Sequence, residues 1–267
     1  MRNTKIEWCD VTWNPVTGCY HGCLYCYARK IAERFGSKAR GAMMEACCNE
    51  GSTIILEHPY FYDNRIEPYP YGFFPTFHMY RLHDLERVKE PSVVFVCSMV
   101  VFVCSMADLF GDWVPDWIIA SVMEACRRSP QHTYLFLTKN PARYQELIAE
   151  KIIKSTDVNF WLGITITGEE RAQDWHQIAF PRVFWSIEPM LGPIPMMDPR
   201  IELNNPKWVV MGAETGNSRN KVVPDRSWVE GYVKIFQLIG VPILMKDSLI
   251  PIVGEENMIR EFPEELQ

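Results

Sequence analysis

The feature that most limits the folds open to this chain is a repeated alternation of short apolar, β-branched runs with longer amphipathic stretches. Eight such runs are bounded by Gly, Pro or polar residues, a pattern typical of buried strands. Because strands that alternate with helices form parallel sheets, the pattern predicts the α/β class, as a full (βα)8 barrel (a TIM barrel) or a partial barrel. The runs are Val11 to Thr17, Phe73 to His78, Val100 to Met106, Thr133 to Thr138, Trp161 to Thr167, Arg182 to Glu188, Trp208 to Gly212 and Pro242 to Lys246.

Five stretches between these runs have the period of amphipathic helices. Asp116 is expected to cap the second helix, and Gly240 falls where the last one should end. The first connection, residues 36–72, has no clear period, so we interpret it as an insertion or lid in a single barrel domain of residues 1–267. The helical stretches are Leu24 to Phe35, Asp116 to Ser129, Pro141 to Lys151, Glu169 to Ile178 and Ser227 to Ile239.

One seven-residue unit occurs twice in succession. Val93 to Met99 and Val100 to Met106 both have the sequence Val-Val-Phe-Val-Cys-Ser-Met. A single strand-like recurrence indicates a local duplication rather than a coiled coil. Only one copy can occupy the strand position, and we assign the second copy to it because that copy leads directly into Asp108.

Charge and hydropathy limit the partners. The net charge of −6 gives no general attraction to phosphate backbones, so a nucleic-acid partner is open but not favoured. No uncharged apolar stretch of about 18 residues is present, and the N-terminal residues lack the apolar run of a signal peptide. We therefore expect a cytoplasmic protein without a membrane segment, whose nine cysteines are reduced thiols or metal ligands.

Three cysteines follow the first predicted strand with the spacing C-x3-C-x2-C: Cys19, Cys23 and Cys26. Three thiolates on one short loop can hold three irons of a [4Fe–4S] cubane and leave the fourth iron open. A structural zinc site is the alternative, with His21 as a fourth ligand, but zinc sites usually separate their cysteine pairs by a longer loop. The other cysteines lie in apolar contexts or, for Cys47 and Cys48, would need partners elsewhere in the chain.

Polar residues end most of the predicted strands. In parallel barrels the functional groups gather at the C-terminal ends of the strands, so these residues are candidates for a site. Glu188, Glu214 and Lys246 would need partners or ligands if they are buried there, and we take them as candidate catalytic groups. The alternative is a structural network of ion pairs at the barrel mouth.

The cysteine motif, with Tyr25 before its third cysteine, resembles the signature of the radical S-adenosylmethionine (SAM) superfamily. Several blocks are also similar to the phage Gp37/Gp68-like proteins of the DUF5131 group. These blocks are Lys5 to Trp8, Thr12 to Cys19, Ser105 to Phe110, Leu137 to Pro141, Ser186 to Pro193 and Gly212 to Gly216.

The resemblance implies that Cys19, Cys23 and Cys26 bind the cluster and that its open iron binds SAM. Reduction by an external one-electron donor of the flavodoxin or ferredoxin type would then cleave SAM to methionine and a 5′-deoxyadenosyl radical, which takes a hydrogen atom from a substrate that stays unidentified. The cofactor contacts expected on this basis are Tyr25, Asp108, Thr138, Thr167 and Gly212.

Three further hypotheses stay open at this point. The first is a non-catalytic iron–sulfur or redox-sensing module, and the second is a zinc-stabilised structural protein. The third, within the enzyme class, is a nucleic-acid lesion lyase.

Overall fold

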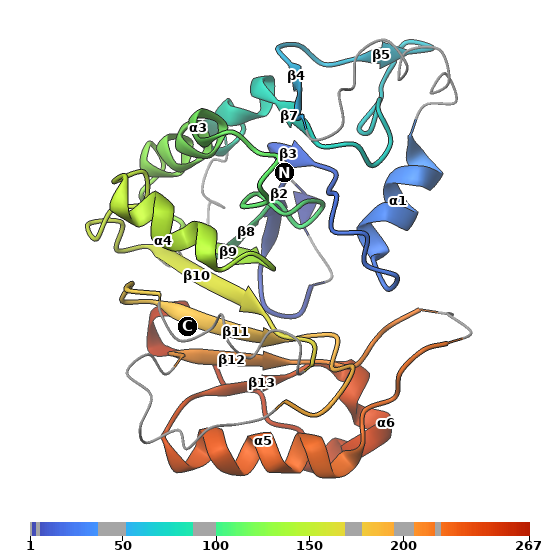
Figure 1. Cartoon of the computed structure of the whole chain (residues 1–267), viewed down its shortest axis with the longest axis vertical. Helices are drawn as coiled ribbons and strands as arrows, with labels where there is room; N and C mark the ends of the chain where they lie inside the picture. Colours follow the sequence, from blue (N-terminus) through green and yellow to red (C-terminus); the bar gives the residue numbers. More distant parts are fainter. Residues whose placement is uncertain are drawn as a thin grey trace. The chain divides into compact units, whose positions relative to one another are not determined.

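The structure is a computed structural model that describes residues 2–3, 6–36, 52–87, 100–168, 178–194, 206–216 and 220–267. The chain groups into two compact units (Figure 1). Unit one comprises Met1–Phe136 and Glu146–Asn159, and unit two comprises Leu137–Gln145 and Phe160–Gln267. The single domain predicted from the sequence stays a prediction.

Unit one contains a sheet in the order β1-β2-β8-β9. The two-residue strand β1 (Arg2–Asn3) pairs antiparallel with β2 (Val11–Trp13), whereas β2 with β8 (Val100–Val103) and β8 with β9 (Thr133–Thr138) are parallel pairs. The second copy of the repeated unit therefore provides β8, as predicted. The first copy, residues 93–99, lies outside the described residues.

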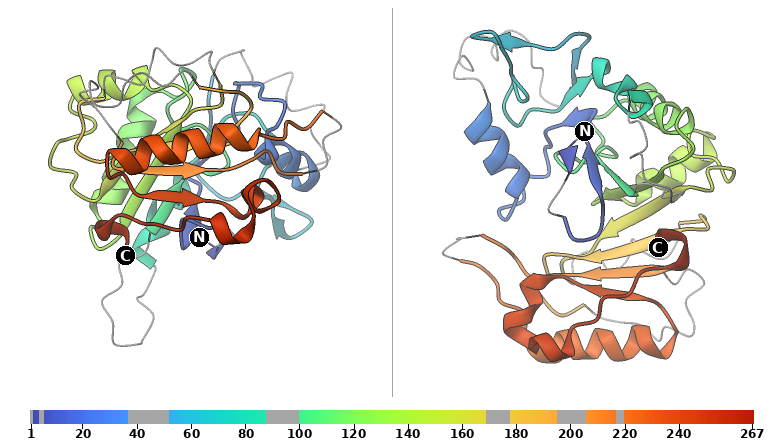
Figure 2. Two further views of the ribbon diagram at one scale, coloured as in Figure 1. Left: turned by 90° about the horizontal axis from the view of Figure 1, so that it is seen from below. Right: turned by 180° about the vertical axis from the view of Figure 1, so that it is seen from behind.

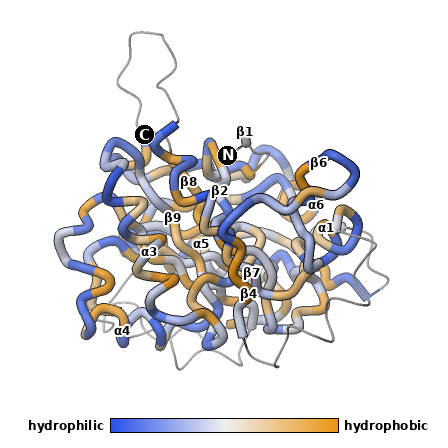
Figure 3. Tube along the Cα trace, turned by 90° about the horizontal axis from the view of Figure 1, so that it is seen from above, coloured by the Kyte–Doolittle hydropathy of each residue, from blue (hydrophilic) through white to orange (hydrophobic). Residues whose placement is uncertain are grey.

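Helix α3 (Asp116–Arg127) connects β8 to β9 and buries an apolar face that includes Ile118, Val122 and Met123. Figure 3 shows the hydropathy changing repeatedly along α3 and α4 (Ala142–Ala149), as expected of helices with one apolar side. The expected cap at Asp116 is wrong. Pro115 occupies the cap position and Asp116 is the first helical residue, because proline fits the extended backbone that precedes a helix.

A second, smaller sheet lies in unit one, in the order β3-β7-β4. Its strands are β3 (Val16–Thr17), β7 (Thr76–His78) and β4 (Ile54–Leu56), with β3 and β7 antiparallel. Placing residues 73–78 in the parallel barrel sheet was therefore wrong. Asn14-Pro15 ends β2, since proline has no N–H to donate to a sheet, and the chain continues in this smaller sheet.

The described part of the first connection contains short strands rather than an irregular loop. Besides β4, it holds the hairpin of β5 (Phe61–Tyr62) and β6 (Arg65–Ile66). Two short 3-10 helices follow β7, at Met79–His83 and Leu85–Arg87. The predicted role of residues 36–72 as a lid stays a prediction, and residues 37–51 lie outside the described part of the chain.

Unit two contains four parallel strands in the order β10-β11-β12-β13. They are β10 (Phe160–Thr165), β11 (Val183–Ile187), β12 (Trp208–Met211) and β13 (Ile243–Met245), and every residue in them is buried, as in a parallel sheet covered on both faces. Helix α5 (Arg226–Leu238) covers one face, where the Phe236 and Trp185 rings lie 5.9 Å apart (Figure 2).

The C-terminal part of unit two consists of short helices. They are 3-10 turns at Asp247–Leu249, Glu255–Asn257 and Glu264–Leu266, and α6 (Ile250–Val253). Gly240 follows α5 with a φ of +70°, which confirms the predicted helix end. The expected helix at Glu169–Ile178 lies outside the described residues, apart from Ile178 itself.

The fold belongs to the α/β class, as predicted. Outside the smaller sheet, seven of the described strands have parallel neighbours: β2, β8 and β9 in unit one and β10 to β13 in unit two. In each unit the parallel strands are neighbours in chain order, which is the progression of a partial βα barrel. The complete (βα)8 barrel is wrong, because the Phe73–His78 run lies in the smaller sheet. No described helix is both long enough and apolar enough to cross a membrane.

Candidate functional site

The cysteine loop, residues 18–26, lies between β3 and α1 (Tyr27–Phe35) in unit one. Gly18 begins it with a φ of +84°, and a Cβ at this position would lie 2.2 Å from the carbonyl oxygen of Phe74. Only glycine fits there. Cys26 ends the loop as the N-cap of α1, where its Sγ accepts a hydrogen bond from the Arg29 backbone N–H at 3.4 Å.

The three thiols of the loop are all partly exposed. Cys19 and Cys26 pack against one apolar cluster of Ala28, Ala32, Phe73 and Met106. Burial is the largest cause that raises the pKa of Cys19 to about 12, and the charges of Asp108, Cys23 and Cys26 act in the same direction. The His21 backbone N–H opposes them with a hydrogen bond to the Cys19 Sγ at 3.4 Å.

The loop is bound through Asp108 to the segment that follows β8. The Asp108 Oδ2 lies 2.7 Å from the His21 Nε2, and its Oδ1 accepts a hydrogen bond from the Phe110 N–H. Asp108 is buried, and the His21 ring also meets Trp113 edge to face, with centroids 5.0 Å apart. Asp108, predicted as a SAM contact, thus holds the cysteine loop, and its contact with SAM stays a prediction.

Asn14 and Tyr27 provide further links that the sequence reasoning missed. The Asn14 Oδ1 accepts hydrogen bonds from the Ser105 hydroxyl at 3.1 Å and the Met106 N–H at 2.9 Å. The Tyr27 hydroxyl donates to the Ser105 carbonyl at 2.7 Å. The segment after β8 is therefore fixed to both sides of the loop. Tyr25 lies within the loop, and its expected proximity to adenine stays a prediction.

The donor set of the loop is three cysteine thiols, which is the ligand type of a [4Fe–4S] cluster. The described residues contain no group of three or more His, Cys, Asp or Glu side chains placed to hold one metal ion. In a cubane each thiolate binds a different iron, so the sulfur atoms need not converge on one point. Backbone N–H groups that donate to sulfur, as those of His21 and Arg29 do, also suit cluster thiolates, because hydrogen bonds to sulfur tune the cluster.

A second polar group forms at the C-terminal ends of the strands of unit two. The register pairs Thr165 with Ser186, Ile187 with Met211 and Met211 with Met245. Continued beyond the strand ends, this register brings four predicted site residues to one level across the sheet. They are Thr167, Glu188, Gly212 and Lys246.

An ion pair spans this row. The Lys246 ammonium donates a hydrogen bond to the Glu188 Oε1, and both side chains are largely buried. Gly212 leaves space for the Glu188 carboxylate, because a Cβ at Gly212 would lie 3.2 Å from the Glu188 carboxyl carbon. Ser186 precedes Glu188 by two residues and so shares its face, and its buried hydroxyl has no hydrogen-bond partner among the described residues.

The other predicted residues of unit two have local hydrogen bonds. The buried Glu214 accepts the Val222 N–H at 3.1 Å, and the Thr138 hydroxyl accepts the Asn140 N–H at 2.9 Å. The Thr167 carbonyl accepts the Leu191 N–H at 2.9 Å. The structure thus brings Glu188, Gly212 and Lys246 together, whereas the ligand contacts expected of Thr138 and Thr167 stay predictions.

Comparison with known proteins gives a family. The sequence model of the family described as "Protein of unknown function (DUF5131)" matches residues 3–248, most of the chain. The chain belongs to the DUF5131 family. No curated protein and no solved structure matches it. In this DUF5131 protein the match includes all the cysteine-loop and strand-end residues described above.

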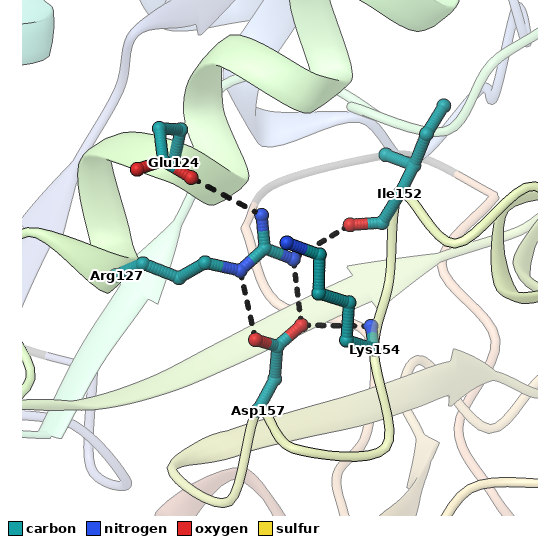
Figure 4. Close-up of polar contacts among 5 residues, drawn as sticks. All are labelled: Glu124, Arg127, Ile152, Lys154 and Asp157. Carbon is teal, nitrogen blue, oxygen red and sulfur yellow. Dashed lines mark hydrogen bonds and ion pairs between the residues drawn. The ribbon is translucent and has the colours of Figure 1, made fainter.

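A third polar network of the DUF5131 protein is structural (Figure 4). Arg127, near the end of α3, forms two hydrogen bonds to Asp157, at 2.8 and 2.7 Å, and a third to the Ile152 carbonyl. Asp157 also accepts the Lys154 N–H at 2.8 Å. The hydrogen bond with Asp157 raises the pKa of Arg127. Because these groups satisfy one another, the network fixes α3 to the segment after α4 and presents no reactive group.

Proposed function

We propose that this DUF5131 protein is a radical SAM enzyme, in which Cys19, Cys23 and Cys26 hold a [4Fe–4S] cluster. The observation that carries the proposal is the local geometry of these cysteines. They lie on one loop between β3 and α1, with two sulfur atoms that accept backbone hydrogen bonds and a hydrogen bond from His21 to Asp108 that links the loop to the segment after β8. The resemblance of the motif to the radical SAM signature is the reason for proposing a [4Fe–4S] cluster and SAM as the cofactors.

The cluster would supply, when bound, an open iron for SAM and the electron that cleaves SAM to methionine and a 5′-deoxyadenosyl radical. The three thiolates of the chain would hold it. The positive end of α1, whose N-cap is Cys26, favours the negative charge that thiolates carry. Ala28, Phe73 and Met106 keep water from the side on which Cys19 and Cys26 pack.

His21 and Asp108 have a positioning role in this proposal. Asp108 holds the imidazole of His21, and the backbone of His21 donates to Cys19, so the hydrogen bond between His21 and Asp108 positions the first proposed ligand. The position of Cys19 is therefore determined by hydrogen bonds as well as by side-chain packing.

Taken by itself, the row of unit two is a proposed binding place for a polar group within that unit. Lys246 carries three N–H donors, of which Glu188 accepts one, and the Ser186 hydroxyl is buried without a partner among the described residues. Because Glu188 neutralises Lys246, the row suits a neutral group with neighbouring donor and acceptor atoms better than a phosphate. Glu188 and Lys246 stay candidate catalytic groups, and the substrate stays unidentified.

The test is anaerobic reconstitution of the full chain with iron and sulfide, followed by dithionite and SAM. We expect bound iron and sulfide and the formation of 5′-deoxyadenosine by the wild type. This formation of 5′-deoxyadenosine should be lost in each of the variants Cys19→Ala, Cys23→Ala and Cys26→Ala. Cys9 is a partly exposed cysteine outside the motif, and Cys9→Ala should retain the activity. Zinc without sulfide would contradict the proposal in favour of a structural metal site. A cluster without SAM cleavage would favour a redox-sensing module.

A further inference from the structure

Helix α1 carries an apolar stripe on its solvent side that begins inside the cysteine loop. Leu24, between Cys23 and Cys26, is 96% exposed. The exposed Tyr27 follows it by three residues, and the exposed Ile31 and Phe35 follow Tyr27 at intervals of four. Because residues four apart share a face of a helix, Tyr27, Ile31 and Phe35 lie on one side of α1, and Leu24 precedes them in the loop. We call these four residues the α1 stripe.

The opposite face of α1 accounts for the packing of the helix. Ala28 and Ala32 are buried, and they contact Phe73 and Met106 in the cluster that also includes Cys19 and Cys26. The α1 stripe is therefore not needed to bury the helix. Adjacent exposed apolar side chains on a soluble protein mark an interaction surface more often than scattered single ones do.

The charges beside the α1 stripe are mostly positive. Arg29, Lys30 and Arg34 lie on α1 with one acidic residue, Glu33, so the helix carries a net charge of +2 in a chain of net charge −6. Arg29 lies over the Phe73 ring at 4.9 Å and Arg34 over the Phe35 ring at 5.3 Å. A basic surface on an acidic protein attracts and orients an acidic partner.

We propose that the α1 stripe, with Lys30 and Arg34, is the docking surface for an acidic one-electron carrier protein of the ferredoxin or flavodoxin type. This inference rests on the proposed function, because such a carrier would pass one electron to the cluster and be oxidised by one electron. Leu24 lies between two of the ligands and Cys26 caps α1, so a protein that covers the stripe also lies against the cysteine loop (Figure 1). A surface of one helix suits the small, transient interfaces of electron-transfer partners.

The test compares two reductants for the reconstituted full chain. A reduced ferredoxin of net negative charge should reduce the wild-type cluster at a rate that falls with added salt. Lys30→Glu/Arg34→Glu should slow this reduction about tenfold at low salt, whereas reduction by dithionite should not change. Ile31→Glu is a second variant that removes apolar contact, and its ferredoxin affinity should fall as well.

The matched control lies on α5, where Lys234 and Leu238 are also exposed. Lys234→Glu and Leu238→Glu should leave ferredoxin-driven reduction unchanged. If Lys30→Glu/Arg34→Glu is reduced by ferredoxin as fast as the wild type, the docking surface is overturned. The same holds if the wild type is a dimer that Ile31→Glu converts to a monomer, because the stripe would then bind a second copy of the chain. If the wild type does not cleave SAM with dithionite as the reductant, the proposed function is overturned instead.

Discussion

His21, inside the cysteine loop, is hydrogen-bonded to Asp108 in the segment after β8, with the His21 Nε2 2.7 Å from the Asp108 Oδ2. The two residues are 87 positions apart in the sequence. This contact connects the loop that would hold a cluster to the parallel sheet of unit one, so the loop is not an independent turn.

Asp108→Ala should therefore weaken the cysteine loop. Removing the carboxylate leaves the largely buried His21 ring and the Phe110 N–H without their acceptor, which should cost about 1–3 kcal/mol of unfolding free energy. In the reconstituted protein, iron should be lost to a chelator faster than from the wild type. The exposed Asp112, changed to Ala, is the control. Equal rates of iron loss for Asp108→Ala and Asp112→Ala would contradict the positioning role of Asp108.

Gly18 and Gly22 offer a matched comparison within the loop. Both have positive φ, +84° and +70°, so alanine costs about 1 kcal/mol of backbone strain at either position. Only at Gly18 does the new Cβ meet a backbone oxygen, at 2.2 Å, whereas the nearest atom at Gly22 is 4.0 Å away. Gly18→Ala should abolish cluster binding and Gly22→Ala should retain it, as measured by iron content. Similar iron contents in the two variants would show that the approach to Phe74 does not shape the loop.

His78 should make the stability of the protein depend on pH. Burial lowers the pKa of His78 well below 6.5, and Arg81 lowers it further. Below pH 6.5 the unfolded chain therefore takes up a proton that the folded chain does not. The unfolding free energy decreases as the pH is lowered, by at most about 1.4 kcal/mol per pH unit. Urea denaturation should show this loss in the wild type and less of it in His78→Gln. An equal loss in His78→Gln and in the wild type would contradict the role of His78.

Asp157→Ala should be among the most destabilising single changes in unit one. The Asp157 side chain is 4% exposed and satisfies the Arg127 guanidinium, so its removal leaves a largely buried charge and should cost about 3–5 kcal/mol. Glu124 contacts the same guanidinium at 3.5 Å from a more exposed position, and Glu124→Ala should cost less than about 1 kcal/mol. Chemical denaturation measures both. Equal losses would mean that the network in Figure 4 does not depend on Asp157.

Much of the fold could be predicted because buried strands have a strong composition signal. The range of β9 matches the expected Thr133 to Thr138, and β11 to β13 lie within their predicted runs. The run at residues 73–78 was assigned to the wrong sheet, because an apolar run indicates a strand but not its neighbours. Only the pairing of β7 with β3 and β4 decides that.

The candidate site could be predicted in part for the same reason. Because both residues follow predicted strands, the sequence placed Glu188 and Lys246 in one set of candidates. Their ion pair depends on the register of the strands, which the sequence does not display. The role of Asp108 was missed because its partner, His21, lies in a loop remote in the sequence. A histidine between motif cysteines was the available signal, and it was considered only as a zinc ligand.

The central claim, that three thiolates of one loop hold a cluster with an open iron, is tested most directly by electron paramagnetic resonance of the reduced, reconstituted protein. We expect a [4Fe–4S] signal whose shape changes when SAM is added, because SAM would bind the iron that lacks a protein ligand. Cys9→Ala should give the same change. A cluster signal that SAM leaves unchanged, or one that persists in Cys19→Ala, Cys23→Ala and Cys26→Ala, would contradict the claim.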